Sequence, residues 1–73
     1  MTQLDCEQLV KEGLRLHEAG DLAGAEVIYR KVLESDHNHA GALHLLGVVA
    51  FQLWRLDSAE ELIRRALQNA ARE

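Results

Sequence analysis

The sequence predicts an all-α fold in which two helix–turn–helix hairpins, four helices in all, stack on one another. The main reason is an internal repeat, because residues 6–39 align with residues 40–73 without a gap. Repeated units of this length bury their apolar faces only against a neighbouring unit. A hydrophobic share of 48% and the absence of proline also fit uninterrupted helices. The identical pairs are Leu9 and Leu43, Gly13 and Gly47, Leu22 and Leu56, Ala25 and Ala59, Glu26 and Glu60, Arg30 and Arg64, and Leu33 and Leu67.

The first helix is predicted from Leu4 to Ala19, where apolar residues recur at helical spacing. Asp5, or Thr2 before it, is expected to cap its start. Gly20 and Asp21 are expected to separate it from the second helix. Glycine supplies the left-handed conformation at a helix end, and aspartate caps the helix that follows.

The second helix is predicted from Leu22 to Ser35, and the polar segment 36–39 is predicted to connect it to the third. The third helix is predicted from Ala40 to Leu53 and is apolar on nearly every side. A helix of that kind has neighbours on every side. The inner face of the second helix is expected to consist of Ala25, Ile28, Tyr29, Val32 and Leu33.

The fourth helix is predicted from Asp57 to Ala71 and has one apolar and one charged side. On the charged side, Glu60 precedes Arg64 and Glu61 precedes Arg65 by four residues. Acid and base at this spacing and in this order stabilise a helix by a few tenths of a kcal/mol per pair. The inward residues are expected to be Ala59, Leu62, Ile63, Ala66 and Leu67.

Small and apolar residues stand at matching places in both units. The second unit has Leu43, then Leu46-Gly47, Ala59, Ile63 and Ala66, and the first has Leu9, Gly13, Leu16, Ala25 and Tyr29. This pattern resembles the tetratricopeptide repeat family, whose signature is W-x2-L-G-x2-Y, then A-x3-F, then a late proline. The resemblance implies one domain over residues 1–73, with a lead-in at 1–5 and repeats at 6–39 and 40–73. It also implies that the hairpins stack as a short right-handed α-solenoid.

The chain departs from the family pattern in three respects. Neither unit has the closing proline, and Glu12 replaces the expected leucine, so this part of the first helix is expected to be exposed. Trp54 stands in the second turn where the first turn has Gly20. A tryptophan with positive φ costs about 1 kcal/mol or more, so the second turn is expected to differ from the first.

Composition excludes several classes of function. The net charge of −4 and the scattered basic residues argue against nucleic-acid binding. No apolar run is long enough to span a membrane, and the first residues do not resemble a signal peptide, so a cytoplasmic location is expected. The single cysteine, Cys6, has no partner for an internal disulfide and is expected to be a small, buried thiol.

No catalytic or metal-binding arrangement is evident. The four histidines are His17, His37, His39 and His44, and they lack the additional ligands that a tetrahedral zinc site needs. Ser35, Asp36 and His37 are neighbours in sequence, but a catalytic triad needs convergence in space and an oxyanion site. The chain is therefore expected to be non-enzymatic and to hold no metal or cofactor.

The resemblance places a binding groove on the first helix of each unit, where family members hold an extended peptide or a partner helix. The groove is expected to be mainly apolar, with histidine and glutamate at its edges. The family's clamp for C-terminal carboxylates uses lysine, asparagine and arginine on this face, and those residues are absent here. The groove positions are Glu7, Val10, Leu14, His17 and Glu18 in the first unit, and Gly41, His44, Val48, Phe51 and Gln52 in the second.

The leading hypothesis is a protein–protein interaction module that belongs to a larger repeat or multidomain protein. The alternative is a self-assembling structural protein, because two repeats are fewer than such folds usually need for stability. In that alternative, a homodimer forms through the C-terminal helices. The expected self-association surface consists of Leu62, Ile63, Ala66, Leu67 and Ala70, with Leu45, Val49 and Leu53 of the third helix also needing cover.

Overall fold

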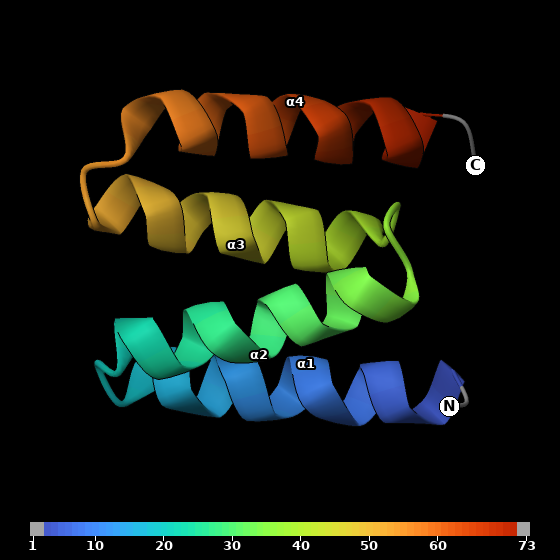
Figure 1. Ribbon diagram of the computed structural model, residues 1–73, viewed down its shortest axis with the longest axis vertical. Coiled ribbons are helices and arrows are strands. Elements are labelled where there is room, and N and C mark those ends of the chain that lie inside the picture. Colours follow the sequence, from blue (N-terminus) through green and yellow to red (C-terminus); the bar gives the residue numbers. More distant parts are fainter. Residues whose placement is uncertain (1–2, 72–73) are drawn as a thin grey trace.

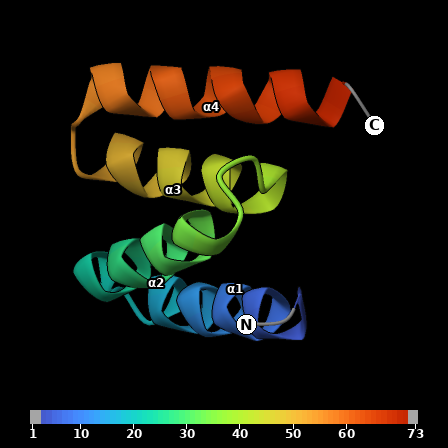
Figure 2. The ribbon, with the colours of Figure 1, turned by 45° about the vertical axis from the view of Figure 1, so that its right-hand side comes forward.

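The computed structural model describes residues 3–71 and arranges them as four helices without a strand. α1 (Gln3–Glu18) and α2 (Leu22–Ser35) form the first hairpin, and α3 (Ala40–Gln52) and α4 (Leu56–Ala71) form the second. The hairpins stack through α2 and α3, so α3 lies between α2 and α4 (Figures 1 and 2). The predicted all-α fold of two hairpins is confirmed.

The helix bounds agree with the prediction to within one residue. α1 begins at Gln3 instead of Leu4, and α4 begins at Leu56 instead of Asp57. The prediction that Asp5 caps α1 is wrong, because Asp5 lies inside the helix. Thr2, the other predicted cap, lies outside the described residues.

Side chains cap α2 and α3 at their N-termini. The Asp21 carboxylate accepts a hydrogen bond from the backbone N–H of Gly24 at 2.9 Å, as predicted for this position. Nδ1 of His39 accepts from the backbone N–H of Ala42 at 3.0 Å. Both bonds satisfy a donor that the first turn of a helix leaves free, so each cap fixes where its helix begins.

The turn between α1 and α2 reverses the chain through Gly20, whose φ is 88°. The backbone N–H of Gly20 donates to the carbonyl of His17 at 3.0 Å, and that of Asp21 donates to the carbonyl of Leu16 at 2.9 Å. These two bonds form the Schellman arrangement that ends many helices with a left-handed residue.

The turn between α3 and α4 has the same arrangement. The backbone N–H of Trp54 donates to the carbonyl of Phe51 at 3.0 Å, and that of Arg55 donates to the carbonyl of Ala50 at 2.8 Å. Trp54 takes φ of 64°, which makes it a left-handed residue like Gly20. The expectation of a different second turn is wrong, because the repeated geometry prevails over the conformational preference of tryptophan.

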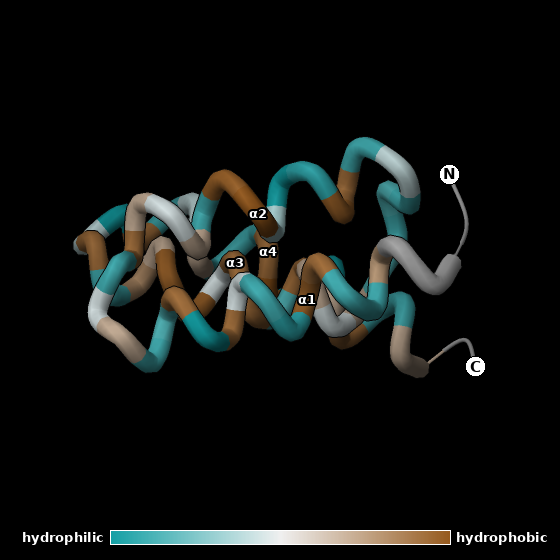
Figure 3. The backbone as a smooth tube through the Cα atoms, turned by 90° about the horizontal axis from the view of Figure 1, so that it is seen from below, coloured by the Kyte–Doolittle hydropathy of each residue, from teal (hydrophilic) through white to brown (hydrophobic). Residues whose placement is uncertain are grey.

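The core includes two clusters of buried residues. One contains Ala25 and Tyr29 of α2 with Leu46 and Val49 of α3, and the other joins Cys6, Val32 and Ala42. Cys6 is thus a buried thiol, as expected. Viewed from the α1 side, hydrophilic and hydrophobic residues alternate along the backbone of α1 and α2, as helices with one covered side require (Figure 3).

Small residues let the helices of each hairpin approach closely. A Cβ on Gly13 would overlap the Tyr29 ring, and a Cβ on Gly47 would lie 2.7 Å from Cγ1 of Ile63. Either methyl group would force its neighbour to move. Gly13 and Gly47 therefore have the same role, which is to let the two helices of their hairpin pack closely.

The charged side of α4 differs from the prediction at one pair. Arg64 contacts Glu60 at 3.4 Å, as predicted, but it also donates to Glu61 at 2.9 Å. The predicted pair of Glu61 and Arg65 does not form, because Arg65 donates instead to the backbone carbonyl of His37 at 3.2 Å. Arg65 therefore ties α4 to the connection between the hairpins.

Candidate binding surfaces

The residues predicted to line a groove lie on α1 and α3, the first helix of each hairpin. The two helices run in the same direction and contact each other to a limited extent (Figure 1). Helical spacing of three or four residues keeps the predicted positions of each helix on one side. We call this set the α1–α3 face: Glu7, Val10, Leu14, His17, Glu18, Gly41, His44, Val48, Phe51 and Gln52.

The centre of the α1–α3 face is apolar. Val10 and Val48 are half-buried, and Leu14 is exposed. Phe51 is 62% exposed, which leaves most of its ring available for contact. Exposed apolar side chains of this size mark a surface suited to covering by other protein.

A hydrogen bond joins the two helices at one end of this face. Nε2 of His17 lies 2.6 Å from Oε1 of Gln52. Because the bond links the last turn of α1 to the last residue of α3, it fixes the two helices relative to each other at that end. The family resemblance assigned both residues to the groove, but nothing in the sequence predicted that they contact each other.

The edges of the α1–α3 face are polar and carry negative charge. Glu7 and Glu18 are exposed, and neither forms an ion pair with any residue of the described chain. His44 and Gly41, on α3, are also exposed. An apolar centre between acidic edges favours an occupant with apolar and basic side chains.

The second predicted surface, on α4, is only partly free. Ala66 is buried within the chain, and Leu62 and Ile63 are half-buried against the core and Gly47. Leu67 is 67% exposed, so the prediction that it points inward is wrong, and Ala70 is also exposed. At the start of the same helix, Leu56 is 50% exposed, a position that the predicted self-association surface did not include.

The prediction that α3 needs cover at three further positions is wrong. Val49 is fully buried, and Leu45 and Leu53 pack against the first core cluster. The reason is that α2 and α4 already flank α3 on both sides.

Comparison with known protein families identifies the repeat. The sequence model of the tetratricopeptide repeat matches residues 16–73, well over half of the chain. The chain belongs to the tetratricopeptide repeat family. No significant match was found among curated proteins or among solved structures. The family assignment therefore rests on this match, and the four helices agree with two repeats of this kind.

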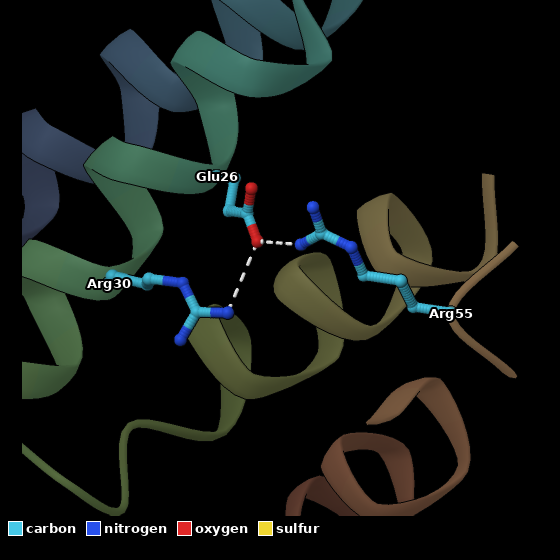
Figure 4. Close-up of polar contacts among 3 residues, drawn as sticks. All are labelled: Glu26, Arg30 and Arg55. Atoms are coloured by element: carbon cyan, nitrogen blue, oxygen red, sulfur yellow. Dashed lines mark hydrogen bonds and ion pairs between the residues drawn. The ribbon is translucent and has the colours of Figure 1, made fainter. Parts of the chain in front are cut away.

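Tetratricopeptide repeats generally mediate protein–protein interactions and are typically non-enzymatic. In this one, the two repeats are joined by a charged contact in addition to the apolar core (Figure 4). Glu26 of α2 accepts hydrogen bonds from Arg30 at 3.1 Å, one turn further along α2, and from Arg55 at 2.5 Å, in the turn of the next repeat.

This contact changes the acidity of Glu26. Burial by itself would raise the pKa of Glu26, but the hydrogen bonds and positive charges of Arg30 and Arg55 outweigh burial and lower it. The carboxylate therefore stays ionised as the first repeat packs against the second, and its charge contributes to their docking.

The four histidines of this tetratricopeptide repeat have separate positions. His39 caps α3, His17 bonds to Gln52, and His37 and His44 are exposed. Within residues 3–71, no three side chains of the metal-binding types come together, and no helix is long and apolar enough to cross a membrane.

Proposed function

We propose that the chain is a protein-interaction module that binds a peptide or a partner helix on the α1–α3 face. The observation that carries this proposal is the exposure of Leu14 on α1 and of Phe51 on α3, within the same set of positions as the half-buried Val10 and Val48. Aromatic side chains contribute strongly to binding when a partner covers them.

The chemistry of the face supports an internal peptide segment as the ligand. None of its ten positions is a lysine or an arginine, so nothing on it would neutralise a terminal carboxylate. Glu7 and Glu18 instead favour a basic residue that flanks an apolar stretch. The proposed ligand is therefore an amphipathic segment with leucine-like anchors and a positive charge near its end.

The experiment selects binders from a displayed library of peptides and measures their affinity for three forms of the protein. These are the original chain, a Leu14→Ser/Phe51→Ser variant and a Val27→Ser variant. Val27 is a matched control, because it is 54% exposed but lies on α2, outside the α1–α3 face.

The double variant should weaken binding at least tenfold, roughly the effect of losing two apolar anchors, and Val27→Ser should not change it. Selected peptides should be rich in leucine and arginine or lysine. Binders that do not distinguish the double variant from the original chain would place the binding site elsewhere and refute the proposal.

Self-association through α4 is a second candidate, favoured by the exposure of Leu56, Leu67 and Ala70. A homodimer that pairs two α4 helices would cover these side chains. Light scattering at micromolar concentration should then give twice the mass of one chain, and Leu67→Glu should return it to the mass of one. A monomeric original chain with a stable fold would exclude this candidate.

A further inference from the structure

The two hairpins offer an internal comparison, because residues 34 positions apart are structurally equivalent. In the first hairpin, Leu22 and Leu33 of α2 pack against the core cluster that contains Leu46 and Val49 of α3. Their equivalents on α4, Leu56 and Leu67, are 50% and 67% exposed. The side of α2 that α3 covers therefore recurs on α4, where no described residue covers it to the same extent.

The same comparison holds for charge. The Glu26 side chain is 16% exposed and binds both Arg30 of its own helix and Arg55 of the next hairpin's turn. Its equivalent, Glu60, is 74% exposed and contacts Arg64 of its own helix at 3.4 Å. The pair within one helix is therefore repeated on α4, with Glu60 and Arg64 in place of Glu26 and Arg30. Among residues 3–71, no arginine from a following turn reaches Glu60 as Arg55 reaches Glu26.

We infer that the outer face of α4, formed by Leu56, Glu60 and Leu67, docks a helical hairpin of defined chemistry. The first helix of that hairpin has apolar side chains like those with which α3 covers α2. Its turn carries an arginine that reaches Glu60 as Arg55 reaches Glu26. The inference goes beyond the proposed binding of a peptide, because it concerns a different face, and it differs from self-association through α4 in its partner.

The first hairpin of a second copy does not fit this face. Where α3 presents Ala42, Leu45, Leu46 and Val49, the equivalent positions of α1 are Gln8, Lys11, Glu12 and Arg15. These polar residues line a shallow depression on α1, and Glu12 and Arg15 form an ion pair there. Covering them with leucines would take the charge of Lys11 and the ion pair of Glu12 and Arg15 out of water, at a desolvation cost that apolar contacts do not offset.

The turn of a second copy's first hairpin is also unsuitable. Asp21 stands at the position of Arg55, so head-to-tail stacking would bring a second carboxylate toward Glu60. Like charges at a contact discriminate against the wrong partner. Pairing of two α4 helices would cover the leucines. It would leave Glu60 without an arginine from the partner's turn, because each Arg55 is already bound to its own Glu26. A separate hairpin with α3-like chemistry therefore matches the face better than a second copy does.

The test lengthens the chain in register. In the extended chain, residues 1–73 are followed by a second copy of residues 40–73, which supplies both the apolar helix and the arginine. In the control chain, residues 1–73 are followed by a second copy of residues 6–39. Thermal unfolding is followed by circular dichroism. The extended chain should unfold about 10 °C above the 73-residue chain, as expected when a repeat gains a full interface, and the control chain should not.

Two variants test the charged contact itself. Both variants are made in the extended chain: Glu60→Gln in the original residues 1–73, and the change of the appended copy's equivalent of Arg55 to glutamine. Each should lower the unfolding midpoint as Glu26→Gln does. The variant with both changes should have the same midpoint as either single variant. In the 73-residue chain, Glu60→Gln should lower the midpoint only slightly, because its side chain is exposed and loses only the pair with Arg64.

Three results would overturn the inference. The first is an equal rise of the unfolding midpoint in the extended and control chains, and the second is no rise in either. The third is an unfolding midpoint of the 73-residue chain that rises with protein concentration, together with little further rise in the extended chain. That result would assign the face to paired α4 helices.

Discussion

Trp54 allows a direct test of how the repeat geometry is maintained. It is the only residue other than glycine with a positive φ in the described chain, and it is 82% exposed. The left-handed conformation costs an L-residue about 1–2 kcal/mol. Since so little of the side chain is buried, its packing recovers only about 0.5 kcal/mol of this cost.

Replacing Trp54 with glycine removes the conformational cost, but it also adds freedom to the unfolded chain and loses the small amount of packing. The net gain should be about 0.5 kcal/mol, which corresponds to roughly 2–4 °C in the unfolding midpoint of a domain this small. Trp54→Ala keeps a Cβ and loses the packing, so it should be slightly less stable than the original chain. The free energy of unfolding should therefore be about 1 kcal/mol higher with glycine than with alanine at position 54.

The matched control is Gln68, an exposed residue inside α4. There the order should reverse, because glycine is about 1 kcal/mol less favourable than alanine within a helix. Chemical denaturation followed by circular dichroism measures all four variants without depending on tryptophan fluorescence. If alanine were as stable as glycine at position 54, Trp54 would not hold a strained conformation in solution, and the reasoning would be refuted.

Three further predictions follow from buried and charged groups. Tyr29→Phe should stabilise the chain by about 1 kcal/mol, because the buried hydroxyl has no hydrogen-bond partner in the described structure; a lower denaturation midpoint would show that the hydroxyl is satisfied. Gly47→Leu should destabilise by about 1–3 kcal/mol in the same assay, since even a Cβ there meets Ile63 at 2.7 Å; an unchanged midpoint would contradict the close packing of α3 and α4. Because the pKa of Glu26 is lowered on folding, the stability lost in Glu26→Gln should be full above about pH 5 and should disappear as the pH falls through the folded pKa. A difference between original and variant that stays constant from pH 7 to about pH 3 would show that this carboxylate does not favour the folded state.

The fold was predictable because its determinants repeat along the sequence. Gly20 and Asp21 mark the first turn by their chemistry, and the 34-residue period extends the same turn to Trp54 even though tryptophan disfavours it. Local preference alone gave the wrong expectation for this second turn. The apolar contacts and hydrogen bonds on both sides of the turn together outweigh the 1–2 kcal/mol preference of a single residue.

The polar contacts were less predictable, because long charged side chains have several partners within reach. Arg65 stands four residues after Glu61, yet the stacking of the hairpins brings it to the carbonyl of His37. Glu26 stands four residues before Arg30 on the same helix, but its contact with Arg55 depends on how the repeats dock. The bond of His17 to Gln52 depends on the same docking. Contacts of this kind follow from tertiary structure, which spacing along one helix does not encode.

The two ends of the stack differ in chemistry, and this difference links the fold to its use. Equivalent positions carry Glu12 and Arg15 on the outer side of α1 but leucine and valine on α3. Leu56 and Leu67 give α4 the apolar character that α1 lacks on its outer side. Under the inference drawn above, a neighbour stacks on α4 but not on α1, so open-ended head-to-tail growth is not expected. The α1–α3 face lies on the sides of both first helices, so a ligand there and a hairpin on α4 could be bound at the same time.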